Sequence, residues 1–208
     1  MKVYKLTSAA VTTHGGYQWA PGEWRESPGT GDLCSNGWLH WYSDPLLGVF
    51  LDPIHAAFGA TARLWEAEAG GKMLDDRGLK GGSTHLRLVR EIPLPVVSME
   101  QRVRFGLYCA QARIGDRCPE WSAWADRWLS GEDRSGEAAA AVAAVAAAAA
   151  ARAARAAARA ASAAARASEA AAWASEAAAR AAAWTAEEAA AAGPPLDLPA
   201  IARRAVEP

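Results

Sequence analysis

The sequence lacks the paired cysteines of disulfide-rich and zinc-finger proteins and the apolar leader of exported ones. Its three cysteines, Cys34, Cys109 and Cys118, form no even set, and no two of them have the spacing of a zinc finger. We therefore expect neither a disulfide framework nor a structural zinc, and a reducing cytoplasm suits this composition best. No apolar segment follows Lys2 and Lys5 within the first 19 residues, so we expect no signal peptide.

The sequence also lacks an excess of charge of one sign. Residues 1–135 carry 15 Lys and Arg against 16 Asp and Glu, and the remaining residues carry 7 of each. A protein that binds duplex nucleic acid normally has a basic face, so we expect no such partner. Alanine inflates the 51% hydrophobic fraction, and the alanine tract is interrupted by Arg and Glu. Such charges are costly within a bilayer, so we expect no membrane partner either.

No established catalytic motif is present. The sequence has no G-x-S-x-G elbow, Walker loop, H-E-x-x-H helix or paired C-x-x-C. The weak catalytic candidates are Glu66, Glu68 and His40, although surface carboxylates two residues apart on a strand are the default interpretation of the first two. Cys34, His40 and His55 make an equally weak set of metal ligands. We therefore predict no metal and no cofactor, and we favour a binding protein over an enzyme.

Residues 1–135 predict a small α+β domain with short antiparallel strands. Residues 2–7 alternate as a strand does, and a stretch rich in glycine and proline follows. The segments 63–69 and 85–92 alternate apolar and charged side chains, which is typical of strands with one solvated face. Two Gly-Gly pairs lie between them, so we expect residues 70–83 to form a wide hairpin connection.

Helix-start signals occur at two places in this domain. Asp44 before Pro45 matches an N-cap followed by proline in the first turn, and Pro53 is expected to end or kink this helix. Ser98 and Gln101 have the spacing of a capping box, which predicts a second helix start. A further short helix over 119–129 would carry three tryptophans on one side, as core or as a docking face: Trp121, Trp124 and Trp128.

Residues 136–192 predict one long alanine-rich helix. Alanine has the highest helix propensity, and no glycine or proline occurs between 137 and 192. From Arg152 the chain reads RAARAAA, RAASAAA, RASEAAA, WASEAAA, RAAAWTA, which is a seven-residue repeat. A strict period of seven favours left-handed supercoiling against a partner helix. Residues 193–208 begin with Gly-Pro-Pro, which ends the helix and leaves a proline-containing tail.

The order of charges along this helix predicts an antiparallel homo-oligomer, because arginines dominate the first half and glutamates the second. The residues expected at the oligomer contact are Arg152, Arg155, Arg159, Arg166, Glu169, Trp173 and Glu176. Three alternatives stay open. The helix folds back on the first domain, it stands alone with local ion pairs, or it is a simple spacer.

Aromatic residues are dense between positions 17 and 42, among turns rather than on a long periodic element. They suit stacking against a planar ligand such as a base. The alternative, which we favour, is that a domain of short strands uses them to fill its core. The residues that would make a ligand site are Tyr17, Trp19, His40, Trp41 and Arg63.

Several short segments of residues 1–135 form a combined pattern. They are GGYQW at 15–19, PG at 21–22, LCSNGWLH at 33–40, DPL at 44–46, LWEAE at 64–68, REIPLP at 90–95 and WLSGEDRS at 128–135. This pattern resembles an uncharacterised family of small proteins from bacteriophages, prophages and environmental viral sequences. Several of these relatives carry alanine-rich tails. The resemblance implies a bacteriophage accessory protein that acts in the host cytoplasm.

This origin leads to a hypothesis about function and two alternatives. The hypothesis is an oligomeric, non-enzymatic protein that captures a host-derived small molecule, such as a nucleotide immune signal, to counter host defence. The first alternative is an enzyme, because the order of elements distantly resembles ADP-ribosyltransferases, although their paired catalytic signature is missing. The second is a scaffold that acts through the long helix.

Overall fold

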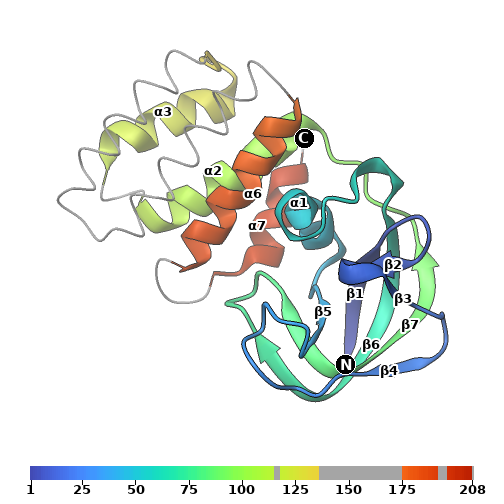
Figure 1. The fold of residues 1–208 in the computed structure, drawn as a ribbon. Coiled ribbons are helices and arrows are strands. Elements are labelled where there is room, and N and C mark those ends of the chain that lie inside the picture. Colours follow the sequence, from blue (N-terminus) through green and yellow to red (C-terminus); the bar gives the residue numbers. More distant parts are fainter. Residues whose placement is uncertain (115–117, 136–174, 192–195, 208) are drawn as a thin grey trace. The chain divides into compact units, whose positions relative to one another are not determined.

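The computed structural model describes residues 1–114, 118–135, 175–191 and 196–207 (Figure 1). The chain divides into two compact units, Met1–Val96 and Val97–Pro208. The first unit contains an antiparallel sheet, and helices make up the second. The mixed α and β class with antiparallel strands is therefore confirmed. The helices that follow Val96, which we expected inside the first domain, group with the C-terminal helices.

The main sheet of the N-terminal unit has the strand order β1-β6-β7-β4, and β5 also pairs with β7. Its strands are β1 (Lys2–Thr7), β4 (Trp24–Glu26), β5 (Leu39–Trp41), β6 (Arg63–Asp75) and β7 (Gly81–Ile92). Directly after β5, Tyr42 exchanges two backbone hydrogen bonds of 2.8 Å with Tyr4 of β1. The path β1, β6, β7, β5 thus returns to β1, which makes a small, partly closed barrel.

The expected wide connection at residues 70–83 is wrong. β6 continues to Asp75 and β7 begins at Gly81, so the two strands form one long hairpin. The register shifts between Gly70 and Met73, and Gly71 has a φ of 73°, which identifies a β-bulge rather than a loop. Gly81 has a packing role instead, because an added Cβ would lie 2.2 Å from the Trp41 ring.

Helix α1 (Pro45–His55) begins where the sequence predicts. The Asp44 carboxylate accepts a hydrogen bond of 2.9 Å from the Leu46 N–H, which confirms the N-cap. Pro53 does not end the helix, contrary to one of our expectations, since the helix runs two residues further. The chain leaves α1 where the Asp52 carboxylate accepts from the N–H groups of residues 58 and 59, at 3.0 and 2.8 Å.

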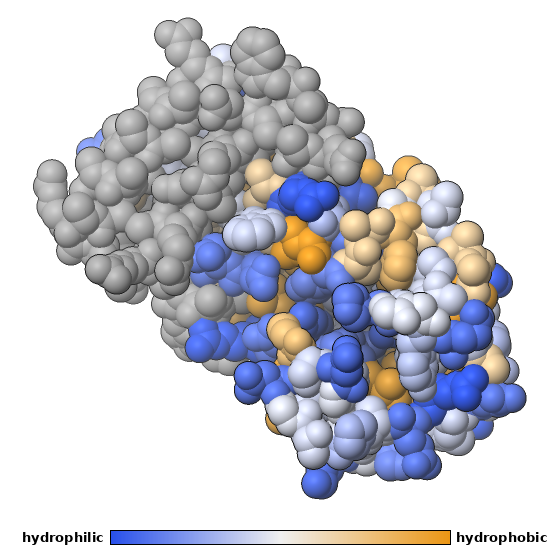
Figure 2. Space-filling model, viewed as in Figure 1, coloured by the Kyte–Doolittle hydropathy of each residue, from blue (hydrophilic) through white to orange (hydrophobic). Residues whose placement is uncertain are grey.

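A small second sheet accompanies the barrel. Strands β2 (Thr12–Thr13) and β3 (Tyr17–Gln18) pair across a 3-10 turn at His14–Gly16. On the face shown in Figure 2, hydrophobic residues of this unit are interspersed with hydrophilic ones. That face gives no support to docking through a wide apolar surface.

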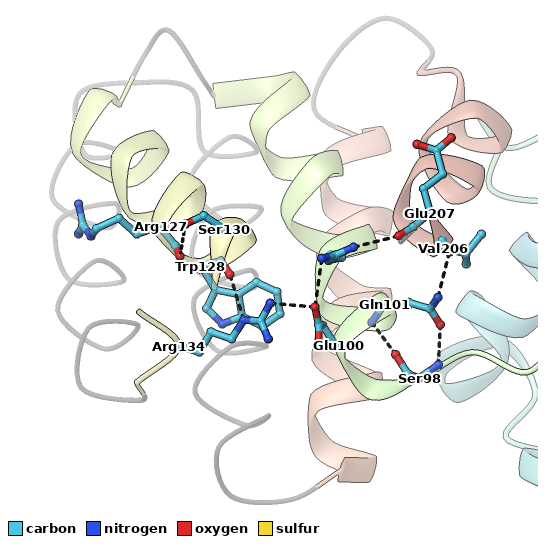
Figure 3. Close-up of polar contacts among 10 residues, drawn as sticks. Ser98, Glu100, Gln101, Arg127, Trp128, Ser130, Arg134, Val206 and Glu207 are labelled. Carbon is cyan, nitrogen blue, oxygen red and sulfur yellow. Dashed lines mark hydrogen bonds and ion pairs between the residues drawn. The ribbon is translucent and has the colours of Figure 1, made fainter. Parts of the chain in front are cut away.

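The C-terminal unit is helical in the residues that the structure describes. Its helices are α2 (Met99–Ile114), α3 (Pro119–Ser130), α6 (Ser175–Ala191) and α7 (Leu198–Val206). The capping box at the start of α2 is confirmed, since Gln101 N–H donates to Ser98 Oγ at 3.2 Å and Ser98 N–H donates to Gln101 Oε1 at 2.8 Å (Figure 3). Glu100 forms ion pairs with Arg104 at 3.1 Å and with Arg134 at 2.8 Å, and the same figure shows the second of these.

Small residues allow α6 to approach α2 closely. A Cβ added at Gly106 would lie 3.1 Å from both the Cα and the carbonyl oxygen of Ala182. Ala183, Ala186 and Ala189 are buried along α6. On α3 the three predicted tryptophans are buried, at positions 121, 124 and 128. The described interior of this unit is thus built mainly from tryptophan, alanine, phenylalanine and aliphatic side chains.

The predicted long helix is not confirmed. Of residues 136–192, the structure describes only α6, Ser175–Ala191. The predicted oligomer contacts from Arg152 to Trp173 lie outside the described residues, and Glu176 lies within α6. The helices in the described part of the chain include none that is both long and apolar enough to cross a membrane.

Candidate functional site

A lysine lies in the core of the N-terminal unit. Lys5 is on β1 and shares a face with Val3 and Thr7, both fully buried, and only 7% of its own surface is exposed. Strand alternation therefore turns the Lys5 side chain into the barrel with the apolar core. Its ammonium donates to the His40 carbonyl at 2.7 Å and lies 5.2 Å from the centroid of the Trp19 ring.

The Lys5 ammonium has basic neighbours. Burial and then the positive charge of Lys80 together lower the pKa of Lys5 to about 7. Lys80 is half-buried at the end of the β6–β7 connection. Within the described residues, no carboxylate forms an ion pair with Lys5 or Lys80. A buried cation without a counter-ion is costly, so this arrangement marks a place where an anion would be stabilised.

His40 adds a third basic group. Its Nε2 contacts the Leu33 carbonyl oxygen. Burial lowers the pKa of His40, and the charges of Lys5, Lys80 and His14 lower it further, whereas the Leu33 carbonyl opposes them. His14 is exposed in the turn between β2 and β3. We call Lys5, His40 and Lys80 the basic cluster.

His55 and Tyr42 form a neutral pair near the basic cluster. The Tyr42 hydroxyl lies 3.1 Å from His55 Nδ1, and the two rings stack with centroids 6.0 Å apart. Burial, then the charges of Lys80 and His40, lower the pKa of His55 to about 3. Burial, then the charge of Asp52, raise the pKa of Tyr42 well above its ordinary value. Both side chains are therefore uncharged near neutral pH.

The aromatic members of the predicted ligand site divide into buried and exposed rings. Trp19 and Trp41 are 3% and 5% exposed and lie in one core cluster with Trp65, so their faces are not open to solvent. Tyr17 is 40% exposed and meets the Trp19 ring edge-on, with centroids 5.3 Å apart. The structure thus brings Tyr17 and Trp19 together, and of these two rings only that of Tyr17 is exposed to solvent.

The remaining predicted site residues are engaged elsewhere. Arg63 donates from Nε to Glu91 at 2.9 Å and lies over the Trp65 ring, outside the basic cluster. Glu66 accepts from Lys2 and Arg90, at 3.0 and 2.7 Å, and these hydrogen bonds lower its pKa.

Glu68 forms an ion pair with Arg87. A general acid needs a raised pKa, so the surroundings of Glu66 do not suit that role. Cys34 is exposed, and the described residues contain no group of three or more metal-ligand side chains.

Sequence reasoning missed Lys5 and Lys80, and it named His55 only as a weak metal ligand and not as the partner of Tyr42. One signal was available, because Lys5 has the same strand parity as Val3, so a buried Val3 implies a buried Lys5. Nothing local to the sequence marks Lys80. Lys80 comes near β1 and β5 only because the barrel brings the connection between β6 and β7 to them.

Comparisons with known proteins bear on the N-terminal unit. Residues 1–100 match a family described as a domain of unknown function, DUF7666. That stretch covers the whole of the first compact unit, Met1–Val96. No curated protein matches the chain. No solved structure matches it either.

Proposed function

We propose that the N-terminal unit binds an anionic small molecule of the nucleotide class at the basic cluster. In this proposal the chain is a bacteriophage accessory protein that captures a host-derived molecule in the host cytoplasm. One observation carries the site: in the described residues the buried Lys5 ammonium donates to a single acceptor, the His40 carbonyl, and has Lys80 rather than a carboxylate as its charged neighbour. That arrangement is suited to an anionic ligand.

The electrostatics explain why an anion would bind. Burial is the largest cause that lowers the pKa of Lys5 and of His40, and the positive charge of Lys80 contributes to both shifts. A phosphate or carboxylate would supply the missing negative charge and accept charge-assisted hydrogen bonds from Lys5 and Lys80. It would also raise the pKa of Lys5, so binding would be accompanied by proton uptake.

The exposed ring of Tyr17 supports a ligand with a planar part. Tyr17 contacts Trp19, and Trp19 lies beside the Lys5 ammonium. A base stacked on Tyr17 would therefore lie on the same side of the unit as the basic cluster. A nucleotide combines these two features, a planar base and an anionic phosphate.

The proposal includes neither the enzyme nor the antiparallel oligomer. No feature of Glu66 or Glu68 favours catalysis, because basic side chains already hold both carboxylates. The antiparallel homo-oligomer stays a separate prediction, since its expected contacts from Arg152 to Trp173 lie outside the described residues.

Calorimetric titration of the full chain with ADP, ATP and a cyclic dinucleotide tests the proposal. We expect at least one of them to bind, more tightly at about pH 6.5 than at about pH 8, because the lower pH supplies the proton that binding takes up. Lys80→Ala should weaken binding about tenfold, as expected when one charged hydrogen-bond donor is lost.

The matched control is Lys72→Ala, because Lys72 is an exposed lysine on β6 that forms no ion pair within the described part of the chain. Lys72→Ala should leave the affinity unchanged. Equal weakening by the two variants would mean that only net charge matters. No binding of any of the three nucleotides would contradict the proposed ligand class.

A further inference from the structure

We propose that Lys5 is also a covalent attachment site, whose amine forms an imine with an aldehyde or ketone group on an anionic ligand. The inference rests on the proposed anion site, because Lys80 and His40 would hold the acidic part of the same molecule. The ligand class is thereby narrowed to a small carbonyl compound that carries a phosphate or a carboxylate.

The position of the Lys5 amine suits a nucleophile. The side chain is desolvated inside the barrel, and the positive charge of Lys80 also disfavours its protonated form. These are the two surroundings that activate lysine amines in proteins. One N–H of Lys5 is directed to the His40 carbonyl at 2.7 Å, which fixes the amine, and the Trp19 ring lies 5.2 Å away.

The protonation state of Lys5 also suits a nucleophile, because a neutral amine is required. With a pKa of about 7, Lys5 is largely the neutral amine at about pH 7.5, whereas an ordinary lysine with a pKa of about 10.4 is almost fully protonated. The charged or titratable groups around it are Lys80 from the β6–β7 connection and His40 from β5, with His14 acting on His40. All three are basic, and Lys80 is the one whose charge, after burial, favours the neutral amine of Lys5.

A small hairpin provides a route to the amine. The Trp19 ring beside Lys5 is held by a hydrogen bond of 3.0 Å from its Nε1 to Thr13 Oγ1. Thr13 ends β2, which pairs with β3, and each strand has only two residues. A two-stranded pairing of this size is marginal, so it opens at a lower cost than the long β6–β7 hairpin does.

The reaction balances without an oxidant or a reductant. The lone pair of the neutral amine forms a bond to the carbonyl carbon, and the C=O π electrons move to the oxygen. That oxygen takes up a proton as the nitrogen loses one, which gives a carbinolamine. Loss of the hydroxyl group with the second amine proton then gives the imine and one water molecule, and hydrolysis reverses the reaction.

Pyridoxal 5′-phosphate, used only as an aldehyde that carries a phosphate, tests the inference. The full chain is incubated with it at about pH 7.5, reduced with borohydride, digested and mapped by mass spectrometry. We expect Lys5 to be labelled at least about tenfold faster than the exposed Lys2 and Lys72, because its neutral fraction is far larger. Labelling in the order of exposure, with Lys5 last, would overturn the inference.

Pyridoxal without the phosphate separates this inference from the proposed anion site. Faster labelling of Lys5 by the phosphorylated probe supports both. Equal rates with the two probes support the reactive amine and contradict the anion site. Reversible calorimetric binding of pyridoxal 5′-phosphate without reduction-trapped label on Lys5 contradicts the imine and supports the anion site.

Two further measurements guard against a folding artefact. Lys5→Arg keeps a cation but has no nucleophilic amine, so the Lys5 label should vanish while Lys2 and Lys72 react as before. Should this variant not fold, the wild-type pH profile is decisive. At a low probe concentration, where the rate reports the unliganded protein, the Lys5 labelling rate should rise through about pH 7 and then level off, whereas a rate that keeps rising to about pH 10 would overturn the inference.

Discussion

The two units of this protein fill their interiors in different ways. The N-terminal unit buries six polar or charged residues: Lys5, Thr7, Asp44, Asp52, Ser83 and Thr84. In the described part of the C-terminal unit, the one buried polar residue is Thr185, whose hydroxyl donates to the Ala181 carbonyl at 2.9 Å. Buried polar and charged side chains are thus concentrated in the barrel, whereas the described helices bury mainly apolar side chains and make their polar contacts nearer the surface, such as Gln111 with Asp126.

This difference predicts different responses to pH. Lys5 and His55 both have lowered pKa values because of burial and basic neighbours, so the stability of the barrel should depend on pH near neutrality. The helical interior around Trp121 and Ala182 contains no such group among the described residues apart from Cys109, whose pKa is raised by burial. Four predictions sharpen or break the comparison, and local hydrogen exchange can report each unit separately.

The largest effect is expected from Trp121→Ala. Trp121 is fully buried on α3, and removing a large aromatic side chain from a core costs about 4 kcal/mol. Hydrogen exchange followed by mass spectrometry should show faster exchange in α2 and α3 to the same extent at about pH 6.5 and 8.5 once intrinsic rates are corrected. Faster exchange of β1, β6 and β7 instead would show that the interiors are not independent.

Lys5→Met should remove a pH dependence of the free energy of unfolding of the barrel. Between the folded pKa of about 7 and the unfolded value of 10.5, the unfolded chain binds a proton that the folded chain does not. The free energy of unfolding of the barrel should therefore rise as pH increases from about 7 to 9, by about 2 kcal/mol.

Urea unfolding at several pH values, followed by exchange in β1, checks this slope. The variant should lose the slope, and the exposed-site control Lys72→Met should keep it. A slope that persists in Lys5→Met would assign the effect to another group. Above about pH 10, Tyr42 acts in the opposite direction because its pKa is raised.

His55→Gln should remove the loss of barrel stability that is expected as the pH falls below neutrality. The pKa of His55 falls from 6.5 to about 3 on folding, so between these values the unfolded chain binds the extra proton and stability falls with falling pH. We expect the wild-type barrel to lose about 1 to 2 kcal/mol between about pH 6.5 and 5, a window in which few carboxylates titrate. Thermal unfolding across that window gives the measurement, and an unchanged pH profile in the variant would contradict the assignment.

The smallest effect is expected from Gly106→Ala. The new Cβ would press on the backbone of Ala182, which costs stability, but alanine improves the helix propensity of α2 by about 1 kcal/mol. We expect a net loss of about 1 kcal/mol, seen as faster exchange in α6. Gly106→Leu should give a clearly larger loss, and equal exchange in both variants would mean that α6 does not approach α2 closely.

Sequence reasoning worked where local signals decide the structure. The N-cap at Asp44, the capping box of Ser98 and Gln101, and the alternation that predicts β6 and β7 were all confirmed. It failed at Gly70 and Gly71, because a glycine pair can mark either a loop or a bulge and only the cross-strand pairing distinguishes them.

The candidate site was less accessible to prediction. His40 and the Tyr17–Trp19 contact came from the aromatic segment, but Lys5 was left as an ordinary strand residue. Its burial depends on the return of Tyr42 to Tyr4, a contact of residues 38 positions apart that closes the barrel over Lys5. No local pattern encodes that closure, since the bridge is one residue pair beyond β5.

A pH titration of the Lys5 side chain by NMR tests the central claim most directly. The Cε resonances of 13C-labelled lysine in the full chain are followed with and without ADP, and Lys5 is assigned by its loss in Lys5→Arg. We predict a midpoint near pH 7 for Lys5 alone and a higher midpoint with the nucleotide bound. A midpoint near the ordinary lysine value of about 10.4, or one that bound nucleotide does not move, would contradict the assignment of the basic cluster as an anion site.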